Sequence, residues 1–446
     1  MNIVVGVIVG LLVLMLLVVL HEGGHFIMSR RNGVHVKEFG IGFPPRAIAW
    51  KYGEDGKWHR FRRKDWSDAN ASDPVFSKSD KSQFKGNSKK LIEPGLIFSI
   101  NFLPIGGFCS MDGESDADTR KGTFGAASFW SKTKILFGGV LMNWLTAIVI
   151  LSVLSITGMP VFLENQFHIE ADTKVEAYPI QVKEVIEGSP AEKGAFKVDD
   201  YIYAAKASSD EKPTDITSSV DLTFFNNDHK AEEVEYYVCR DSDEIEGTVD
   251  YETSVVLGDC KRTILKTTLN DETKDYLLGI SMRNTGATTY HSTWSAPING
   301  IVLTGQLTGE TFKGLGMMIG DLFKGVFKQF SSDETVRNEG KAELEAAGDS
   351  VTGPVGILGM LFPSFIELGP THLAFLAAVI SISLACMNVL PIPALDGGRW
   401  LLIGYFRLRK KKLDTETENR IVSRAFMVIL ALAVLITILD IMRLAR

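Results

Sequence analysis

The stretch "VVLHEGGHFIMSRR", residues 18–31, closes an apolar run and carries two histidines, one glutamate and two adjacent glycines. Residues 3–20 hold no charged side chain, and a helix that crosses a bilayer needs about 20 consecutive apolar residues. The sequence therefore predicts a first transmembrane helix over residues 1–30. A cleaved signal peptide is the alternative, but a basic N-terminal region and a small-residue cleavage site are both lacking. Gly23 and Gly24 are poor helix formers, and we expect them to allow another backbone to approach closely.

The motif HEGGH has the spacing of a zinc site. His21 and His25 are four residues apart and therefore lie on one face of a helix, where both rings can bind one zinc ion. Glu22 can take a proton from a water molecule held by that ion. The alternative is that these groups only cap the helix end, but ionisable groups inside a membrane cost free energy and usually mark function. His21 lies about 13 Å along the helix from Arg30, so we predict a zinc site below the cytoplasmic surface.

Three further blocks of apolar residues are long enough to cross a bilayer. They lie within residues 132–158, 351–406 and 425–446. Hydrophobic residues make up 45% of the chain, and their concentration in such blocks excludes an ordinary soluble protein. We predict a polytopic α-helical membrane protein with about four transmembrane helices.

The distribution of charge predicts the orientation of these helices. The net charge is −7, yet residues 29–131 hold 17 Lys and Arg against 12 Asp and Glu, whereas residues 160–292 hold 13 against 27. Arg30 and Arg31 follow the first span, and "RLRKKK" begins a basic loop at residues 407–424. Cytoplasmic loops are enriched in Lys and Arg. We therefore place that loop in the cytoplasm, together with the segment 31–131, and both chain termini outside.

The segments between the spans differ in character. Residues 31–131 read as β-strands that dip toward the membrane, interrupted by a polar insertion at residues 65–90. Residues 160–292 read as a β-rich extracytoplasmic domain. The sequence leaves undecided whether Cys239 and Cys260 form a disulfide in this domain. Residues 293–345 have apolar residues at helical spacing. They predict an amphipathic helix that lies either along the outer membrane face or against the outer domain.

The segment "NVLPIPALDGGR", residues 388–399, offers a third metal ligand. Pro391 and Pro393 end the third transmembrane helix because proline lacks the N–H that a helix needs. The chain can then turn back and direct Asp396 toward the first helix, with Gly397 and Gly398 permitting a tight turn. Taken alone, this segment would sooner predict a solvated aspartate in a loop that ends a helix.

HEGGH in the first span and NVLPIPALDGG in a late span together resemble the site-2 protease family of intramembrane zinc metalloproteases, which are M50 peptidases. More narrowly, the chain resembles bacterial members that cleave anti-sigma factors. Four further stretches resemble family elements in the expected order, so that the resemblance covers most of the chain. They are "LPIGGFCSMDGE" (103–114), "FGGVLMNW" (137–144), "GSPAEKGAFKVDDYI" (188–202, the start of a PDZ-like domain) and "GPVGI" (353–357).

The resemblance implies an enzyme with a Zn²⁺ cofactor. Its zinc ligands would be His21, His25 and Asp396, and Glu22 would be the general base. The expected reaction is cleavage of single-span proteins within their membrane segments, such as anti-sigma factors or signal-peptide remnants. A helical peptide bond is shielded by its own hydrogen bonds, so the substrate must be unwound first.

The resemblance also implies substrate-binding residues. Asn388 and the Pro391–Pro393 segment would hold the substrate as an unwound strand. The strand "FGIGF", with Gly40 and Gly42, would pair with it by β-addition. For Asn143 two roles remain open, namely ordering a substrate residue or bridging two helices.

The chain departs from the family at its PDZ-like domain. The usual Gly-Asp of the carboxylate-side loop reads Asp199-Asp200 here. The domain is therefore at least as well suited to excluding large ectodomains as to binding a C-terminal carboxylate. We expect a multi-pass protein of the bacterial cytoplasmic membrane whose partners are the lipid bilayer and membrane-spanning substrates, with no nucleic-acid partner. The sequence does not predict the oligomeric state.

Overall fold

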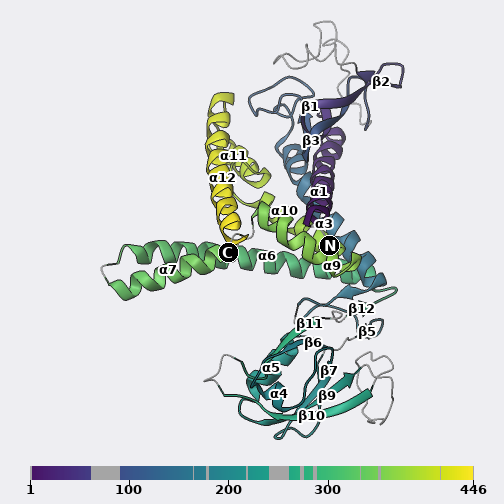
Figure 1. The fold of residues 1–446 in the computed structure, drawn as a ribbon. Helices are drawn as coiled ribbons and strands as arrows, with labels where there is room; N and C mark the ends of the chain where they lie inside the picture. Colours follow the sequence, from purple (N-terminus) through teal and green to yellow (C-terminus); the bar gives the residue numbers. More distant parts are fainter. Residues whose placement is uncertain are drawn as a thin grey trace. The chain divides into compact units, whose positions relative to one another are not determined.

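The computed structural model describes residues 3–61, 91–163, 165–176, 180–216, 219–240, 261–271, 276–284, 289–331, 333–349, 353–411 and 413–444. The insertion predicted at residues 65–90 lies outside the described residues. The chain forms two compact units, one of residues 1–151 with 300–446 and the other of residues 152–299. Figure 1 traces the elements of each unit by colour along the chain.

Three helices within the described part of the chain are long and apolar enough to cross a membrane. They are α1 (Ile3–Arg31), α3 (Phe129–Thr157) and α10 (Pro370–Val389). They occupy the positions of the first three predicted spans. The fourth apolar block lies on α12 (Thr415–Leu444), and the total of four spans stays a prediction.

The basic loop predicted at residues 407–424 is shorter than expected. Helix α11 (Asp396–Leu408) extends into it, and α12 already begins at Thr415. The side chain of Asp414 accepts a hydrogen bond from the backbone N–H of Thr417 at 2.9 Å. This contact satisfies one of the free N–H groups at a helix start, which explains why the polar residues 415–424 are helical.

The N-terminal half of α1 packs closely against a short helical segment that precedes α10. This segment consists of α8 (Pro354–Gly356), the π-helical turn η3 (Ile357–Leu361) and α9 (Phe362–Glu367). A Cβ atom on Gly6 would lie 2.5 Å from the Pro363 ring, and one on Gly10 would lie 2.7 Å from the Phe362 ring. Small residues four apart allow this kind of close packing between membrane helices.

A three-stranded sheet lies beside the C-terminal half of α1. Its order is β2 (Trp58–Phe61), β1 (Val36–Tyr52) and β3 (Ile97–Met111). Both long strands turn back on themselves, with positive φ angles at Gly42 (76°) and Gly106 (78°). As a result, Gly40 pairs with Phe108 on one side and with Ser99 on the other.

The turns of these strands reach far along α1. A Cβ atom on Gly107 would lie 3.2 Å from the side chain of Val19, which is two residues before His21. Phe43, Phe102 and Leu103 near the turns expose their apolar side chains. This arrangement is consistent with strands that dip to membrane depth.

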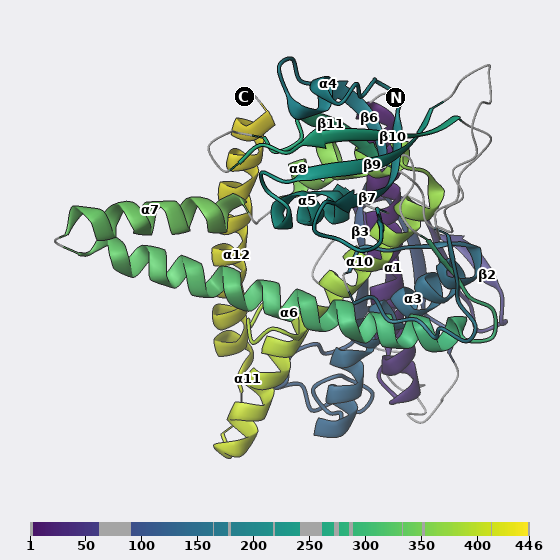
Figure 2. The same cartoon turned by 90° about the horizontal axis from the view of Figure 1, so that it is seen from below.

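Two further helices of the chain form an antiparallel hairpin (Figure 2). They are α6 (Ala296–Gln329) and α7 (Glu334–Asp349), where the sequence predicts one amphipathic region at residues 293–345. At the turn, the side chain of Gln329 donates to the carbonyl of Arg337 at 3.1 Å.

The second unit is built on a six-stranded sheet. Its main path runs β10-β9-β7-β6-β11, with β8 paired to β7. These strands are β6 (Ile180–Val185), β7 (Tyr201–Ala207), β8 (Thr214–Asp215), β9 (Glu233–Arg240), β10 (Lys261–Thr268) and β11 (Ile280–Asn284). The short helices α4 (Pro190–Lys193) and α5 (Ser219–Asp228) accompany the sheet, and a small sheet joins β4 (Met159–Pro160), β12 (Thr289–His291) and β5 (Lys174–Glu176).

The core of this unit is apolar, with Ile180, Ile202 and Val238 fully buried. Its assignment as a PDZ-like domain stays a prediction. Cys239 is disulfide-bonded, and its predicted partner Cys260 lies outside the described residues. Asp199 adopts a positive φ of 69°, the backbone conformation that the family's glycine would adopt without strain.

Candidate metal centre

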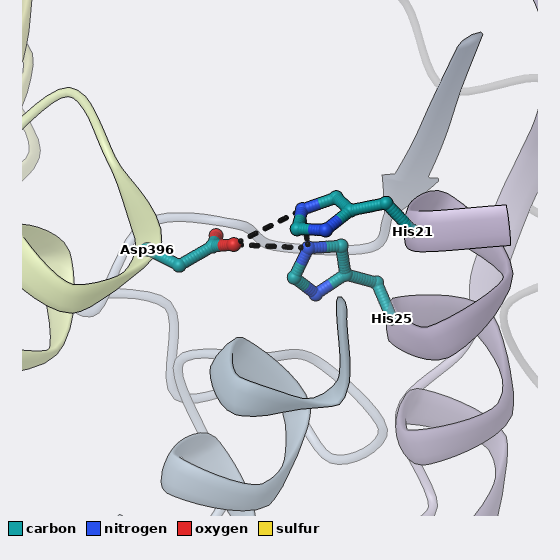
Figure 3. Close-up of side chains that lie close together, drawn as sticks. All are labelled: His21, His25 and Asp396. Carbon is teal, nitrogen blue, oxygen red and sulfur yellow. Dashed lines mark hydrogen bonds and ion pairs between the residues drawn. The ribbon is translucent and has the colours of Figure 1, made fainter. Parts of the chain in front are cut away.

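Helix α1 places the two histidine rings of HEGGH side by side. The Nε2 atoms of His21 and His25 are 3.2 Å apart, and both side chains are buried. The carboxylate of Asp396, at the start of α11, completes the cluster (Figure 3). Its Oδ2 lies 3.3 Å from Nε2 of His21 and 3.2 Å from Nε2 of His25.

These three atoms form a nearly equilateral triangle, which is the geometry of one face of a tetrahedral metal site. Ligands that bind a tetrahedral zinc ion at about 2.0–2.1 Å lie about 3.3–3.4 Å from each other. The observed separations of 3.2–3.3 Å match this edge closely. Two histidines and one carboxylate also form a common protein ligand set of catalytic zinc, which leaves one position open.

The hydrogen bonding of His25 fixes which ring nitrogen faces the cluster centre. Its Nδ1 lies 2.9 Å from the backbone carbonyl of Ile135 on α3. A carbonyl only accepts, so Nδ1 carries the hydrogen and, in the neutral ring, Nε2 has a free lone pair. Among the described residues, the buried Oδ2 atom of Asp396 has no hydrogen-bond donor. A carboxylate oxygen facing the lone pair of His25 Nε2 fits a bound cation.

Glycines bring α3 close enough to α1 to complete this geometry. A Cβ atom on Gly24 would overlap the carbonyl oxygen of Gly138, so the two helices touch there. A Cβ atom on Gly139 would lie 2.6 Å from Nε2 of both histidines. The expected close approach is therefore correct for Gly24 but wrong for Gly23, whose Cβ position faces open space.

A tight turn after α10 directs Asp396 toward the histidines. The N–H of Ile392 donates to the carbonyl of Leu390 at 2.8 Å, and the N–H of Leu395 donates to the carbonyl of Ile392 at 2.8 Å. Cβ atoms on Gly397 and Gly398 would overlap backbone atoms of this segment. The two glycines are therefore required where the chain folds back on itself.

Strand β3 positions Glu22 beside the cluster. The Glu22 carboxylate accepts a hydrogen bond from the backbone N–H of Cys109. Burial raises the pKa of the neighbouring Cys109 thiol, so this cysteine stays neutral near the site and does not supply a thiolate.

Comparison with known proteins decides the family. The model of "Peptidase family M50" matches residues 9–61 and 88–433. The chain belongs to peptidase family M50. The Regulator of sigma-W protease RasP of Bacillus subtilis is 25% identical over 469 residues, which cover 96% of each chain. Zinc metalloprotease RasP of Oceanobacillus iheyensis is 24% identical over 471 residues, and that of Bacillus licheniformis is 25% identical over 472, each again covering 96% of both chains.

The predicted recognition, enzyme class and cofactor are thereby confirmed. The protein is a zinc metalloprotease of the site-2 type, and its cofactor is Zn²⁺. Its long apolar helices identify it as an integral membrane protein.

The predicted substrate-binding residues of this M50 protease lie in different settings. The side chain of Asn388 donates within α10 to the carbonyl of Leu384 at 3.0 Å, and Pro391 in the following turn is exposed. Asn143 is fully buried, and its side chain has no hydrogen-bond partner in the described part of the chain. Its backbone carbonyl accepts from the Ser381 hydroxyl at 2.9 Å and so bridges α3 and α10.

One expectation about β-addition has to be corrected. Gly40 is hydrogen-bonded within the sheet on both of its sides, so its backbone is not a free edge for a substrate. In the order β2-β1-β3, the edge strands are β2 and β3, and the Cys109 N–H of β3 reaches Glu22. Backbone pairing to both sides was not visible in the sequence because each strand turns back on itself.

Three groups of the centre were missed by sequence reasoning. They are the carbonyl of Ile135, the N–H of Cys109 and Gly139, whose lack of a side chain leaves room for both histidine rings. The first two are backbone groups and leave no signal in residue type. Gly139 is the second glycine of "FGGVLMNW", so the double glycine was the available signal.

Proposed function

We propose that the protein is an intramembrane endopeptidase that cleaves single-span membrane proteins within their membrane segments. The observation that carries this proposal is the position of the histidine and aspartate cluster along α1. His21 lies ten residues before the end of the apolar stretch Val4–Arg31, which corresponds to about 15 Å of helix. A peptide bond cut at this depth has to lie in the membrane.

In this proposal His21, His25 and Asp396 hold the zinc ion. The bound ion supplies Lewis-acid polarisation of the scissile carbonyl and activation of a water molecule. Glu22 takes the proton of that water on its carboxylate and later gives it to the leaving amine. The hydrogen bond from Cys109 keeps the carboxylate in place for both transfers.

The substrate would bind as an extended strand along the edge of β3. This edge passes directly by Glu22, and an added strand would unwind the substrate helix while its backbone groups stay hydrogen-bonded. Asn388, Pro391 and Pro393 at the end of α10 would line the opposite side. Asn143 would contribute to ordering the substrate, since its buried amide groups have no described partner.

The orientation and the outer unit complete the proposal. Arg30, Arg31 and the basic residues after Arg407 would face the cytoplasm. The chain termini and the unit of residues 152–299 would lie outside the bacterial inner membrane, where the unit excludes substrates with large ectodomains. The similarity to a protein named Regulator of sigma-W protease favours membrane-bound regulators of sigma factors as substrates.

Reconstitution into lipid vesicles tests this function. A single-span substrate with a short ectodomain is mixed with the purified enzyme, and the cleavage site is mapped by mass spectrometry. We expect a cut within the apolar segment, which the Glu22→Gln variant should not make. Cleavage confined to soluble flanking residues, or equal cleavage of a soluble protein, would refute the intramembrane assignment.

A further inference from the structure

The first turn of α11, which carries Asp396, is anchored by a partly buried ion pair. Arg399 lies one turn after Asp396, and its Nε and Nη2 atoms donate to Oε1 of Glu418 at 3.3 and 3.2 Å. The same guanidinium donates to the backbone carbonyl of Glu114 and stacks on the ring of the buried Phe124, with Cζ 4.9 Å from the ring centroid. The Arg399 guanidinium is therefore held by hydrogen bonds to Glu418 and Glu114 and by the Phe124 ring against its face.

Glu418, in the first turns of α12, is held from the other side by the loop after β3. The side chain is only 5% exposed. Its Oε2 accepts from the backbone N–H of Asp116 at 3.0 Å and from the Ser115 hydroxyl at 3.3 Å. Both carboxylate oxygens are thus occupied, and the pair cannot shift without leaving buried polar groups unsatisfied.

A second anchor joins α11 to α3. The indole N–H of Trp400 donates to the Thr133 hydroxyl at 2.9 Å. Thr133 lies two residues before Ile135, whose carbonyl orients the His25 ring. The same end of α3 therefore contacts both helices that carry the cluster. The Ile135 carbonyl holds His25 on α1, and the Thr133 hydroxyl holds Trp400 on α11.

We propose that Arg399 and Glu418, assisted by Trp400 and Thr133, are positioning residues that set the zinc affinity of the site by holding Asp396 against the two histidines. This inference rests on the proposed role of Asp396 as a zinc ligand. Metal ligands must be held within about 0.5 Å of their bonding position. The two rings are fixed by α1, whereas Asp396 follows a turn and depends on the orientation of α11.

Zinc affinity of the full-length protein in detergent, measured by competition with a chelating dye, tests this inference. We expect Glu418→Ala to lower the affinity by about 10–100-fold, which is the usual effect of groups that support metal ligands. Glu418→Gln keeps one acceptor oxygen but replaces the other with an NH₂ donor, so its loss should lie between the wild type and Glu418→Ala. The kcat of zinc-saturated Glu418→Ala should fall while KM is unchanged, because the residue does not touch the substrate.

Glu416 provides a matched control. It lies in the same turn of α12 and forms an exposed ion pair with Arg420 at 2.7 Å. Because exposed pairs contribute little, Glu416→Ala should leave zinc affinity unchanged. An equal loss in Glu416→Ala and Glu418→Ala would overturn the inference.

Two further variants separate positioning from misfolding. Arg399→Met combined with Glu418→Leu removes both charges of the pair and should remain folded by circular dichroism, yet bind zinc about 10-fold or more weakly. Thr133→Val removes the hydroxyl that accepts from Trp400 and donates to the Phe129 carbonyl, and it should lower the affinity by a smaller factor. Wild-type affinity in both folded variants would refute the inference, whatever the folding of Glu418→Ala.

Asp396→Ala distinguishes this failure from that of the proposed function. If Asp396→Ala binds zinc like the wild type, the ligand assignment itself is wrong, and the inference fails with it. If Asp396→Ala loses zinc while the Arg399 and Glu418 variants keep it, only the positioning role is refuted.

Discussion

Two aspartates, one buried in the outer unit and one half-buried beside the histidines, occupy opposite electrostatic settings. Asp200 in the outer unit is 1% exposed, and both of its carboxylate oxygens accept from the guanidinium of Arg240. Its Oδ2 also accepts from the N–H of Lys197 at 2.7 Å. Asp396 instead directs one oxygen at Nε2 of His21 and His25. The first carboxylate has its cation within the protein, whereas the second is arranged for a cation from outside.

The two settings distinguish a structural carboxylate from a candidate metal ligand. A buried charge is tolerated when it is paired and hydrogen-bonded. Asp200 meets this condition with protein groups alone. Asp396 faces two histidine rings instead, a setting that suits the Zn²⁺ cofactor and agrees with its proposed role as a ligand.

The strongest test of the metal-centre side of this comparison is Glu22→Gln. The variant keeps the three proposed ligands but loses the group that accepts the proton, so cleavage should fall by about 10²–10⁴-fold. Zinc content, measured by atomic absorption, should remain at the wild-type level. Near-wild-type cleavage would remove Glu22 from its proposed role.

The outer-unit side is tested by Arg240→Ala. Removing the partner leaves Asp200 buried and unpaired, which should cost about 3–5 kcal/mol of the free energy of unfolding of this unit. Hydrogen exchange of the strands β7 and β9 in the full-length protein measures this loss, and zinc content should not change. Lys266→Ala is the control, because Lys266 is 60% exposed in its pair with Glu235 and should contribute about 0–1 kcal/mol. Equal losses in both variants would contradict the distinction.

A smaller effect is expected from Gly139→Ala at the helix contact. The added methyl group would lie 2.6 Å from both ring nitrogens and should lower zinc affinity by about tenfold or more, since overpacking costs about 1–3 kcal/mol. Gly23→Ala places the same methyl group in open space on α1 and should bind zinc normally. If chelator competition gives the same affinity for both variants, the close approach of α3 does not shape the site.

The smallest effect concerns backbone strain in the outer unit. Ala195 and Ala231 have φ angles of 60° and 59°, which disfavour any residue with a Cβ atom. Glycine at either position should raise the free energy of unfolding by about 0.5–1 kcal/mol. Ala204→Gly, on strand β7, should instead lower it. A loss of stability in all three variants would show that the left-handed positions are not strained.

Much of the centre was predictable because its chemistry is carried by side chains at fixed spacing. His21 and His25 are four residues apart on one helix, and helical geometry alone brings their rings together. Asp396 was predictable only from the prolines and glycines around it, and without the resemblance a solvated loop would have been the better prediction. The spacing of two residues on one helix predicts that their side chains lie close together. It does not predict that a segment far away in the sequence, such as the one with Asp396, will meet them.

The parts that sequence reasoning missed depend on backbone groups and on chain reversal. The N–H of Cys109 and the carbonyl of Ile135 exist in every residue type, so nothing in the sequence distinguishes them. The pairing of Gly40 on both sides follows from two strands that each turn back, which alternation of apolar residues does not reveal. Helix α12 began earlier than predicted because the Asp414 side chain caps residues that looked like a polar loop.

The division of the cluster between α1 and α11 has a consequence for biosynthesis. Asp396 is translated 371 residues after His25, and a ribosome adds about 5–20 residues per second. On the proposed assignment, a nascent chain would carry an incomplete set of zinc ligands throughout this interval. Such a molecule would stay inert toward neighbouring proteins at the translocation site until α11 has been made.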